Sequence, residues 1–409
     1  MSPLGRREFL VGTVAVTALT QAGCTSTRSA IETRPDGGKF RTPLCDLLGI
    51  EYPILQSGMG GVAGPKLAAE VSRAGGLGIL AGLGLTADEL RRRIRQVREL
   101  TDRPFGANLW LHTELRPPAD VARIPEGTVR AVQGALNRFR QRLGLPETFA
   151  RPAAFPDLID AAFEVILEER VPVWSIGLGD PGSEMVRRCR ERGIKVVAMV
   201  CTLDDARAVA RSGVDVIVAQ GGEAGGHRST WVKGSSREVA TIGTMALVPQ
   251  IVDAVKVPVV AAGGIADGRG LVAAIALGAS GILLGTRFVA TQESEAPDFH
   301  RRAILERGSD ATTVSDAFTG LYARWFRNTF TEEYAASGAP VFPALVQARA
   351  ARDIFVKAAA QRDPEYFPMP TGQSAGLIHD LPGAAEVVQA IVREARGVLP
   401  ALSQRIRLG

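Results

Sequence analysis

Short apolar runs alternate with amphipathic stretches through the middle of the chain, between residues 53 and 284. These runs are too short for buried helices and are typical of parallel strands covered on both faces. Eight strands alternating with helices over about 240 residues predict an α/β fold, the (β/α)8 TIM barrel. A doubly wound open sheet is the rival, but it does not normally need so many strands. The predicted strands span residues 53–59, 76–81, 104–111, 171–176, 195–200, 214–220, 257–262 and 281–284.

The amphipathic stretches between these runs are predicted to be helices. Pro65 opens the first of them, at a position where the missing N–H group has no helical partner to lose. Thr86 and Glu89 have the spacing of a capping box at the start of the next. Further barrel helices are predicted at residues 157–169, 182–192, 203–212 and 267–277.

Two segments depart from this alternation. Residues 112–156 are rich in Pro and Arg and contain one predicted helix, at 129–143. We interpret them as an insertion above the third strand, where barrel enzymes often build a lid or a substrate wall. The barrel itself is then expected over residues 39–291, and residues 292–409 are expected to form a C-terminal helical cap region near the barrel mouth. Helices of that region are predicted at residues 295–305, 343–361 and 384–396.

The first 38 residues are expected to be a signal and a tether. Arg6 and Arg7 precede an apolar run that is shorter than the roughly 20 residues needed to cross a bilayer, as in a twin-arginine export signal. Cys24 follows Ala-Gly as at a lipoprotein cleavage site, although Gln21 stands where an aliphatic residue is usual. The segment predicts export to the periplasm or cell envelope, with Cys24 as a candidate lipid anchor. A basic, frayed N-terminus on a cytoplasmic protein is the alternative.

Charge and cysteine usage exclude several classes of function. The net charge of +5 comes largely from arginines scattered over predicted helices, without interleaved aromatic residues, so nucleic-acid binding is not expected. Cys45, Cys189 and Cys201 form no closely spaced metal-binding pattern, and no metal site is predicted. No G-x-G-x-x-G fingerprint follows an early strand, so a separate nicotinamide-binding domain is not expected either.

The sixth predicted strand ends at Gln220 and runs into a loop with four glycines, followed by His227. Glycines let the backbone approach a flat or anionic ligand closely, because positive φ carries little steric penalty without Cβ. An imidazole titrates near neutral pH and can act as a general base. His227 is therefore the candidate catalytic residue, and a surface histidine beside a glycine-rich turn is the alternative.

Strands seven and eight also end in glycines, at Gly263, Gly264 and Gly285, the last followed by Thr286. In barrels of this class a phosphate often binds beside the last two strands, on backbone N–H groups. Two such ends on adjacent strands predict a phosphate site, although glycines also end strands merely to turn the chain. A second glycine loop at residues 372–376 either reaches the ligand or is a helix-to-helix turn.

Taken together, these motifs resemble the nitronate monooxygenases, formerly called 2-nitropropane dioxygenases, from about Thr42 to the end of the chain. The resemblance rests on residues 53–59, 105–109, 220–227, 262–270, 284–288 and 372–376. It implies a barrel that holds FMN without a covalent bond, and His227 matches the family's catalytic histidine. By matching motif, the implied flavin contacts are Ser57, Gly58, Met59, Asn108, Gln220, Gly225, Gly226, Gly263, Gly264, Leu283, Leu284, Gly285 and Thr286.

The implied activity is an FMN-dependent oxidation of alkyl nitronates, and of nitroalkanes after loss of a proton, with O2. The same motifs occur in a flavin-dependent enoyl-acyl-carrier-protein reductase and in flavin NADH:quinone reductases. An NAD(P)H-dependent reductase of a quinone or an enoyl thioester is therefore one alternative, and a non-catalytic exported flavin-binding protein is another. Ser57-Gly58 and Ser229-Thr230-Trp231 depart from the family pattern beside the expected pocket, so the sequence leaves the substrate open.

Overall fold

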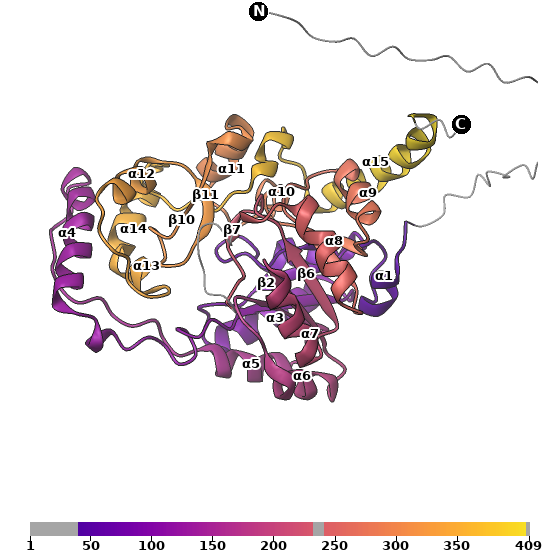
Figure 1. Cartoon of the computed structure of the whole chain (residues 1–409), viewed down its shortest axis with the longest axis horizontal. Helices are drawn as coiled ribbons and strands as arrows, with labels where there is room; N and C mark the ends of the chain where they lie inside the picture. Colours follow the sequence, from indigo (N-terminus) through magenta and orange to yellow (C-terminus); the bar gives the residue numbers. More distant parts are fainter. Residues whose placement is uncertain (1–39, 232–240, 406–409) are drawn as a thin grey trace, which may run out of the picture. The chain divides into compact units, whose positions relative to one another are not determined.

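Eight parallel strands form a barrel in the computed structural model, which describes residues 40–231 and 241–405 (Figure 1). The first and second strands close it, since Gln56 donates to the carbonyl of Leu77 and Leu77 donates to that of Ile54, each over 2.9 Å. All eight strands predicted from the sequence are confirmed. Their bounds are β1 (Ile54–Gln56), β2 (Gly78–Ala81), β3 (Phe105–Trp110), β4 (Val173–Gly177), β5 (Lys195–Val200), β6 (Val216–Gln220), β8 (Val259–Ala262) and β9 (Gly281–Leu284).

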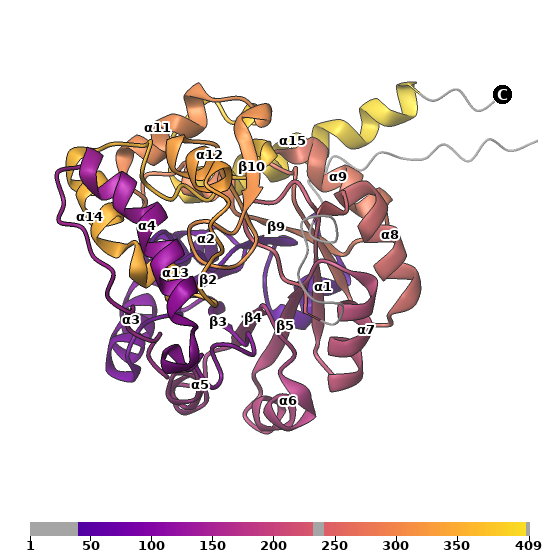
Figure 2. The same cartoon turned by 60° about the vertical axis from the view of Figure 1, so that its left-hand side comes forward.

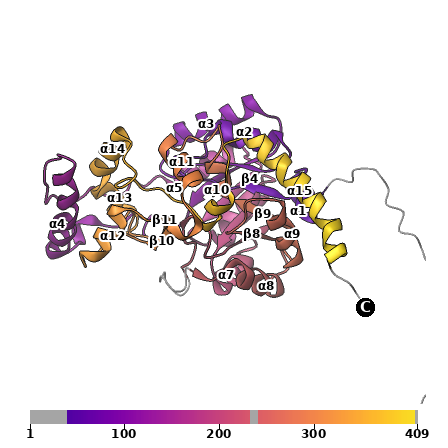
Figure 3. The same ribbon diagram turned by 90° about the horizontal axis from the view of Figure 1, so that it is seen from above.

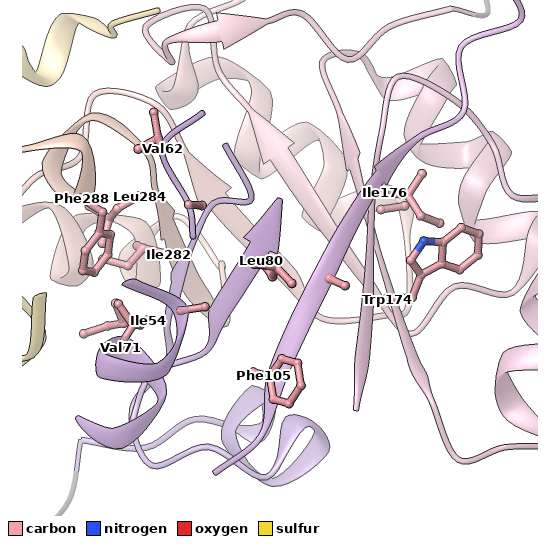
Figure 4. Close-up of a cluster of buried hydrophobic side chains, with 14 of the residues drawn as sticks. Ile54, Val62, Val71, Leu80, Phe105, Trp174, Ile176, Ile282, Leu284 and Phe288 are labelled. Carbon is pink, nitrogen blue, oxygen red and sulfur yellow. The ribbon is translucent and has the colours of Figure 1, made fainter. Parts of the chain in front are cut away.

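Alternate residues of each strand point into the barrel or out toward the helices. Leu55 and Leu283 belong to the cluster of buried side chains inside the barrel. Ile54 and Leu284 lie in the outer cluster, between the strands and the helices (Figure 4). A short helix that the sequence did not predict, α1 (Pro43–Leu48), buries its apolar side chains in the inner cluster and so covers one end of the barrel.

The predicted barrel helices form with small shifts at their ends. Thr86 caps one of them by accepting the N–H of Glu89, as its spacing predicted. One helix, α8, was not predicted; Pro249 lies inside it and obscures its pattern. The helices are α2 (Pro65–Arg73), α3 (Ala87–Leu100), α5 (Ile159–Glu168), α6 (Gly182–Arg190), α7 (Leu203–Ser212), α8 (Thr244–Ala254) and α9 (Gly268–Ala276).

The last helix of the chain, α15 (Ala384–Arg405), packs against α2 and α9, which come early and late in the barrel (Figure 3). The approach to α9 is close: a Cβ on Gly268 would lie 2.3 Å from the backbone nitrogen of Ala395. Glu394 also accepts the N–H of Gly268 over 2.9 Å. The ring of helices around the barrel is therefore completed by the final helix.

A second hydrophobic core joins the insertion after β3 to the C-terminal third. Helix α4 (Glu126–Arg142) packs there with α12 (Thr329–Ala336), α13 (Val346–Ala350) and α14 (Arg352–Gln361) (Figures 1 and 2). Phe139 of α4 stacks on Phe330 of α12, with ring centroids 4.7 Å apart. Arg140, which is buried, pairs with Asp353 across the same contact, with Nε 2.8 Å from Oδ2. We call this core and its helices the second lobe.

The C-terminal third, which its pattern predicted to be mostly helical, also contains two strands. β10 (Thr312–Ser315) and β11 (Ala323–Phe326) pair antiparallel, and β11 pairs further with β7 (Gly226–His227). This small sheet ties the loop after β6 to the C-terminal third. The remaining elements are α10 (Thr286–Val289), α11 (Asp298–Glu306) and the 3-10 helices η1 (Val121–Arg123), η3 (Ser309–Ala311) and η4 (Gln373–Leu377).

The predicted export signal and Cys24 lie outside the described residues. Within residues 40–231 and 241–405, no helix combines the length and the apolar character that a membrane span requires.

Candidate active site

A cavity of about 410 Å³ lies at the carboxyl ends of the barrel strands. This is where ligands bind in barrels of this class, and the volume falls within the range of roughly 300–1,000 Å³ typical of small-molecule sites. Leu284 is absent from its lining, because its side chain alternates to the outer face of β9. The other predicted site residues line it together: Ser57, Gly58, Met59, Asn108, Gln220, Gly225, Gly226, His227, Gly263, Gly264, Leu283, Gly285 and Thr286.

One end of the cavity carries unpaired backbone donors. Gly263 and Gly264 have φ of 110° and 71°, in the left-handed region that favours glycine. Among the described residues, no acceptor lies on the N–H groups of Gly264, Gly285 and Thr286. The Thr286 hydroxyl oxygen accepts the N–H of Gly372 over 2.9 Å, which leaves its hydrogen available to a ligand. Converging N–H groups of this kind suit a phosphate.

Close backbone packing shapes the neighbouring wall of the cavity. A Cβ on Gly58 would lie 2.4 Å from Cβ of Asn108, so only glycine fits at that position. The Asn108 amide nitrogen donates to the carbonyl and the hydroxyl of Ser175, over 3.3 and 3.1 Å. These bonds fix the amide with its nitrogen toward β4. The wall therefore combines a flat stretch of backbone with one oriented amide, and it suits the face and edge of a planar ring.

His227 lies in the wall between the barrel and the C-terminal third. It pairs with Ala323 of β11, and its ring lies against Trp110 and Trp325, with centroid separations of 4.5 and 5.5 Å. Its Nε2 atom lies 2.9 Å from the hydroxyl oxygen of Thr319. That hydroxyl is also 3.2 Å from the carbonyl of Leu321, which can only accept. The network assigns the hydrogen of the neutral ring to Nε2 and leaves Nδ1 as the proton acceptor.

The surroundings keep this imidazole neutral. Burial, together with the nearby Arg228 and His112, lowers the pKa of His227 to about 3. No carboxylate of residues 40–231 and 241–405 contributes to the shift in favour of the charged form. The ring is therefore unprotonated over the whole neutral pH range.

Three buried side chains hold the glycine-rich loop that carries His227. Gln220 donates to the carbonyl of His227 over 3.0 Å and accepts the N–H of Ser229 over 3.0 Å. The thiol of Cys201 also donates to the Gln220 amide oxygen, over 2.8 Å. The guanidinium of Arg228 donates to the carbonyls of Ala224 and Gly221, over 2.6 and 3.2 Å. With its amide engaged in this way, Gln220 positions the histidine loop.

The second glycine loop lies at the cavity. Gly372 bonds to Thr286 as described, and the N–H of Gln373 donates to the carbonyl of Glu223 over 2.8 Å. Ser374 lines the cavity. Of the two alternatives that the sequence left open, a loop at the ligand site or a simple helix-to-helix turn, the structure therefore favours the loop at the ligand site.

The sequence did not indicate the aromatic part of the lining. Apart from Trp110, it comes from the C-terminal third and includes a second histidine, His300, which is buried and whose Nε2 lies 3.0 Å from the hydroxyl oxygen of Thr371. Burial lowers the pKa of His300 to about 4, so this ring is neutral as well. No local motif marks these residues, because each reaches the cavity only through the fold of the C-terminal third. The lining residues missed in this way are His300, Phe318, Thr319, Trp325, Ala348, Phe355 and Phe367.

Comparison with known proteins places this site in a family. The family model for nitronate monooxygenase matches residues 41–394. A probable nitronate monooxygenase of Staphylococcus saprophyticus is 34% identical over 364 residues, which cover 88% of this chain and 99% of the relative. The nitroalkane oxidase of Streptomyces ansochromogenes is 35% identical with a TM-score of 0.78, covering 88% and 99% of the two chains. FabK of Thermotoga maritima is 32% identical with a TM-score of 0.69, covering 90% and 99%.

Proposed function

The chain belongs to the nitronate monooxygenase family of flavin-dependent oxidoreductases, and from this premise we propose that it oxidises alkyl nitronates with O2, using FMN. Nitroalkanes are substrates once His227 has removed their α-proton. In the net reaction two nitronates and one O2 give two carbonyl compounds and two nitrite ions, so atoms and charge balance. The observation that carries the proposal is a neutral histidine in a cavity whose other end offers unpaired backbone N–H groups.

The residues of the cavity fit FMN. Gly264, Gly285 and Thr286 would hold its phosphate, and the backbone at Gly58 with the Asn108 amide would lie along its ring system. When bound, FMN supplies the electron-accepting chemistry, and the protein supplies orientation and a dry site.

His227 has two parts to play at the substrate. For a nitroalkane, Nδ1 takes the α-proton while Thr319 holds the opposite side of the ring through Nε2. For a nitronate, which has already lost that proton, the ring contributes only contact and polarity. Trp110 and Trp325 flank the imidazole on two sides.

An anaerobic stopped-flow experiment on the full-length protein, purified with its flavin, tests this function. The protein is mixed separately with ethyl nitronate and with NADH, and the flavin absorbance is followed. Loss of the oxidised flavin spectrum with ethyl nitronate and no change with NADH is the expected result. Reduction by NADH alone would contradict it and would favour a reductase.

A further inference from the structure

A continuous row of aromatic rings leads away from His227. Its ring meets Trp325 at 5.5 Å, Trp325 meets Phe318 at 4.9 Å, and Phe318 meets Phe355 at 5.5 Å between centroids. All four line the cavity, as does Ala348. Trp325 belongs to β11 and Phe355 to α14, so the row runs from the small sheet to the second lobe, while Ala348 belongs to α13. We call the part of the cavity lined by Trp110, Phe318, Trp325, Ala348 and Phe355 the apolar arm.

The described lining of the cavity carries no fixed charge. Among the described residues that line it there is no Lys, Arg, Asp or Glu. Two buried arginines near its walls already donate to other protein groups. Arg228 donates to the carbonyls of Ala224 and Gly221, and Arg324 donates to the carbonyl of Gly222 over 2.8 Å and to the Thr312 hydroxyl over 3.0 Å. A charged group on the tail of a substrate would therefore be buried without a partner, which is strongly unfavourable.

On the basis of the proposed function, we propose that the preferred nitronates carry an uncharged apolar tail, that this tail lies in the apolar arm, and that Ala348 and Phe355 set its length. The nitronate carbon faces His227, and the tail extends along Trp325 and Phe318 toward α13 and α14. Nitronates with a carboxylate on the tail are poor substrates. The selection is made by the second lobe and not by the barrel, because the residues at the far end of the arm come from α13 and α14.

Each methylene that enters such an arm adds a predictable gain in binding. Burial of one CH2 group tightens binding by about fourfold, equivalent to about 0.8 kcal/mol. The small side chain of Ala348 leaves room at the far end of the arm. A larger side chain there would occupy the volume that a long tail needs, and a short tail would not reach it.

The test measures dissociation constants through quenching of tryptophan fluorescence, since Trp110 and Trp325 line the arm. Ethyl, butyl and hexyl nitronates form the length series. Propionate 3-nitronate is compared with its uncharged isostere, 3-methylbutyl nitronate, for the effect of charge. Flavin reduction under anaerobic conditions is followed in the same samples. We expect binding at least about tenfold tighter for hexyl than for ethyl nitronate, and at least about tenfold tighter for the isostere than for propionate 3-nitronate.

Ala348→Phe should abolish the gain with tail length, so that hexyl nitronate binds no more tightly than ethyl nitronate. Ala360→Phe, on the exposed face of α14, is the matched control and should retain the full length series. Phe355→Ala should let the gain in binding continue to tails longer than hexyl. If Ala348→Phe fails to fold, the wild-type length and charge series and Phe355→Ala still decide the matter.

Different outcomes of these experiments contradict the proposal for the apolar arm and the proposed function. If ethyl nitronate reduces the flavin but tail length has no effect, or if propionate 3-nitronate binds as well as its isostere, the arm is wrong and the function stands. If no nitronate reduces the flavin, yet binding tightens with tail length and Ala348→Phe removes that gain, the function is wrong and the arm stands.

Discussion

The Nε2 atom of His227 lies 2.9 Å from the hydroxyl oxygen of Thr319, although 92 residues separate the two in sequence. One comes from the loop after a barrel strand and the other from the loop between β10 and β11. In this contact Nε2, which carries the hydrogen, bonds to Thr319, and Nδ1 remains free to accept a proton. Thr319 is thus a positioning residue for the proposed base.

Thr319→Val should lower kcat/KM for a nitroalkane by about three- to tenfold, the usual value of one hydrogen bond. The isosteric change removes the partner of Nε2 and lets the ring turn or change tautomer. We expect the pH profile of the nitroalkane reaction to change with it, while nitronate oxidation is nearly unaffected. Thr319→Ser keeps the hydroxyl and should restore both rate and profile. An equal loss on both substrates would argue for a purely structural role.

His227→Asn should produce a larger difference between the nitroalkane and nitronate rates than Thr319→Val does. A positioned general base contributes about 10²- to 10⁴-fold, so nitroalkane turnover should fall by that factor. Nitronates need no proton removal and should lose less than about tenfold. Steady-state rates with nitroethane and with ethyl nitronate, on one preparation with a measured flavin content, give the comparison. The base role is wrong if both rates fall together.

His300 and His227 should make the protein less stable in acid. Their pKa values in the folded state, about 4 and about 3, lie below the unfolded value of about 6.5. As the pH falls below 6.5 the unfolded chain binds protons first, so stability present at higher pH is lost between about pH 6.5 and pH 4. Linkage gives a loss of about 2 kcal/mol per histidine at pH 5.

His300→Gln isolates one of these contributions. Between pH 7.5 and pH 5 the unfolding free energy of the wild type should fall by about 2 kcal/mol more than that of the variant, because only the wild type has this histidine to protonate. Urea denaturation at the two pH values measures it. Parallel pH dependence of the two proteins would show that the folded-state pKa of His300 is not depressed.

Gly264→Ala should weaken flavin binding. Its φ of 71° makes any side chain strained, at about 1–2 kcal/mol, and an altered backbone would misdirect the N–H group at the phosphate end of the cavity. We expect the dissociation constant of the flavin to rise about tenfold, equivalent to about 1.4 kcal/mol. Gly338→Ala is the control: its φ of 67° brings the same strain, and a Cβ there meets nothing within 4 Å. Both variants should be destabilised alike, and Gly264→Ala alone should release flavin on dilution.

The barrel and the polar half of the site could be predicted because their signals are local. Parallel strands buried on both faces leave apolar runs such as residues 214–220, and the glycines whose N–H groups face the cavity unpaired directly follow two of those runs. Leu284 shows the limit of motif matching. It stands in the matched segment, but the period of two along β9 directs its side chain away from the cavity.

The aromatic half of the site could not be predicted in the same way. Trp325 and Phe355 lie in segments whose local pattern shows only strand or helix character, and they line the cavity because the core that they share with α4 of the distant insertion holds them there. The two-residue strand β7 is too short to have a periodicity at all. Helix α1 is also short, and only its burial inside the barrel makes it stable.

The position of α15 between α2 and α9 sets the order in which this protein can be completed during synthesis. The apolar faces of α2 and α9 stay uncovered while the ribosome adds residues 277–383, and the helix that covers them is the last structured element to emerge. The ring of helices around the barrel is therefore complete only once Ala384–Arg405 has left the ribosome. A chain released before Ala384 should remain sensitive to protease and bind no flavin, whereas the full-length chain should acquire resistance and cofactor together.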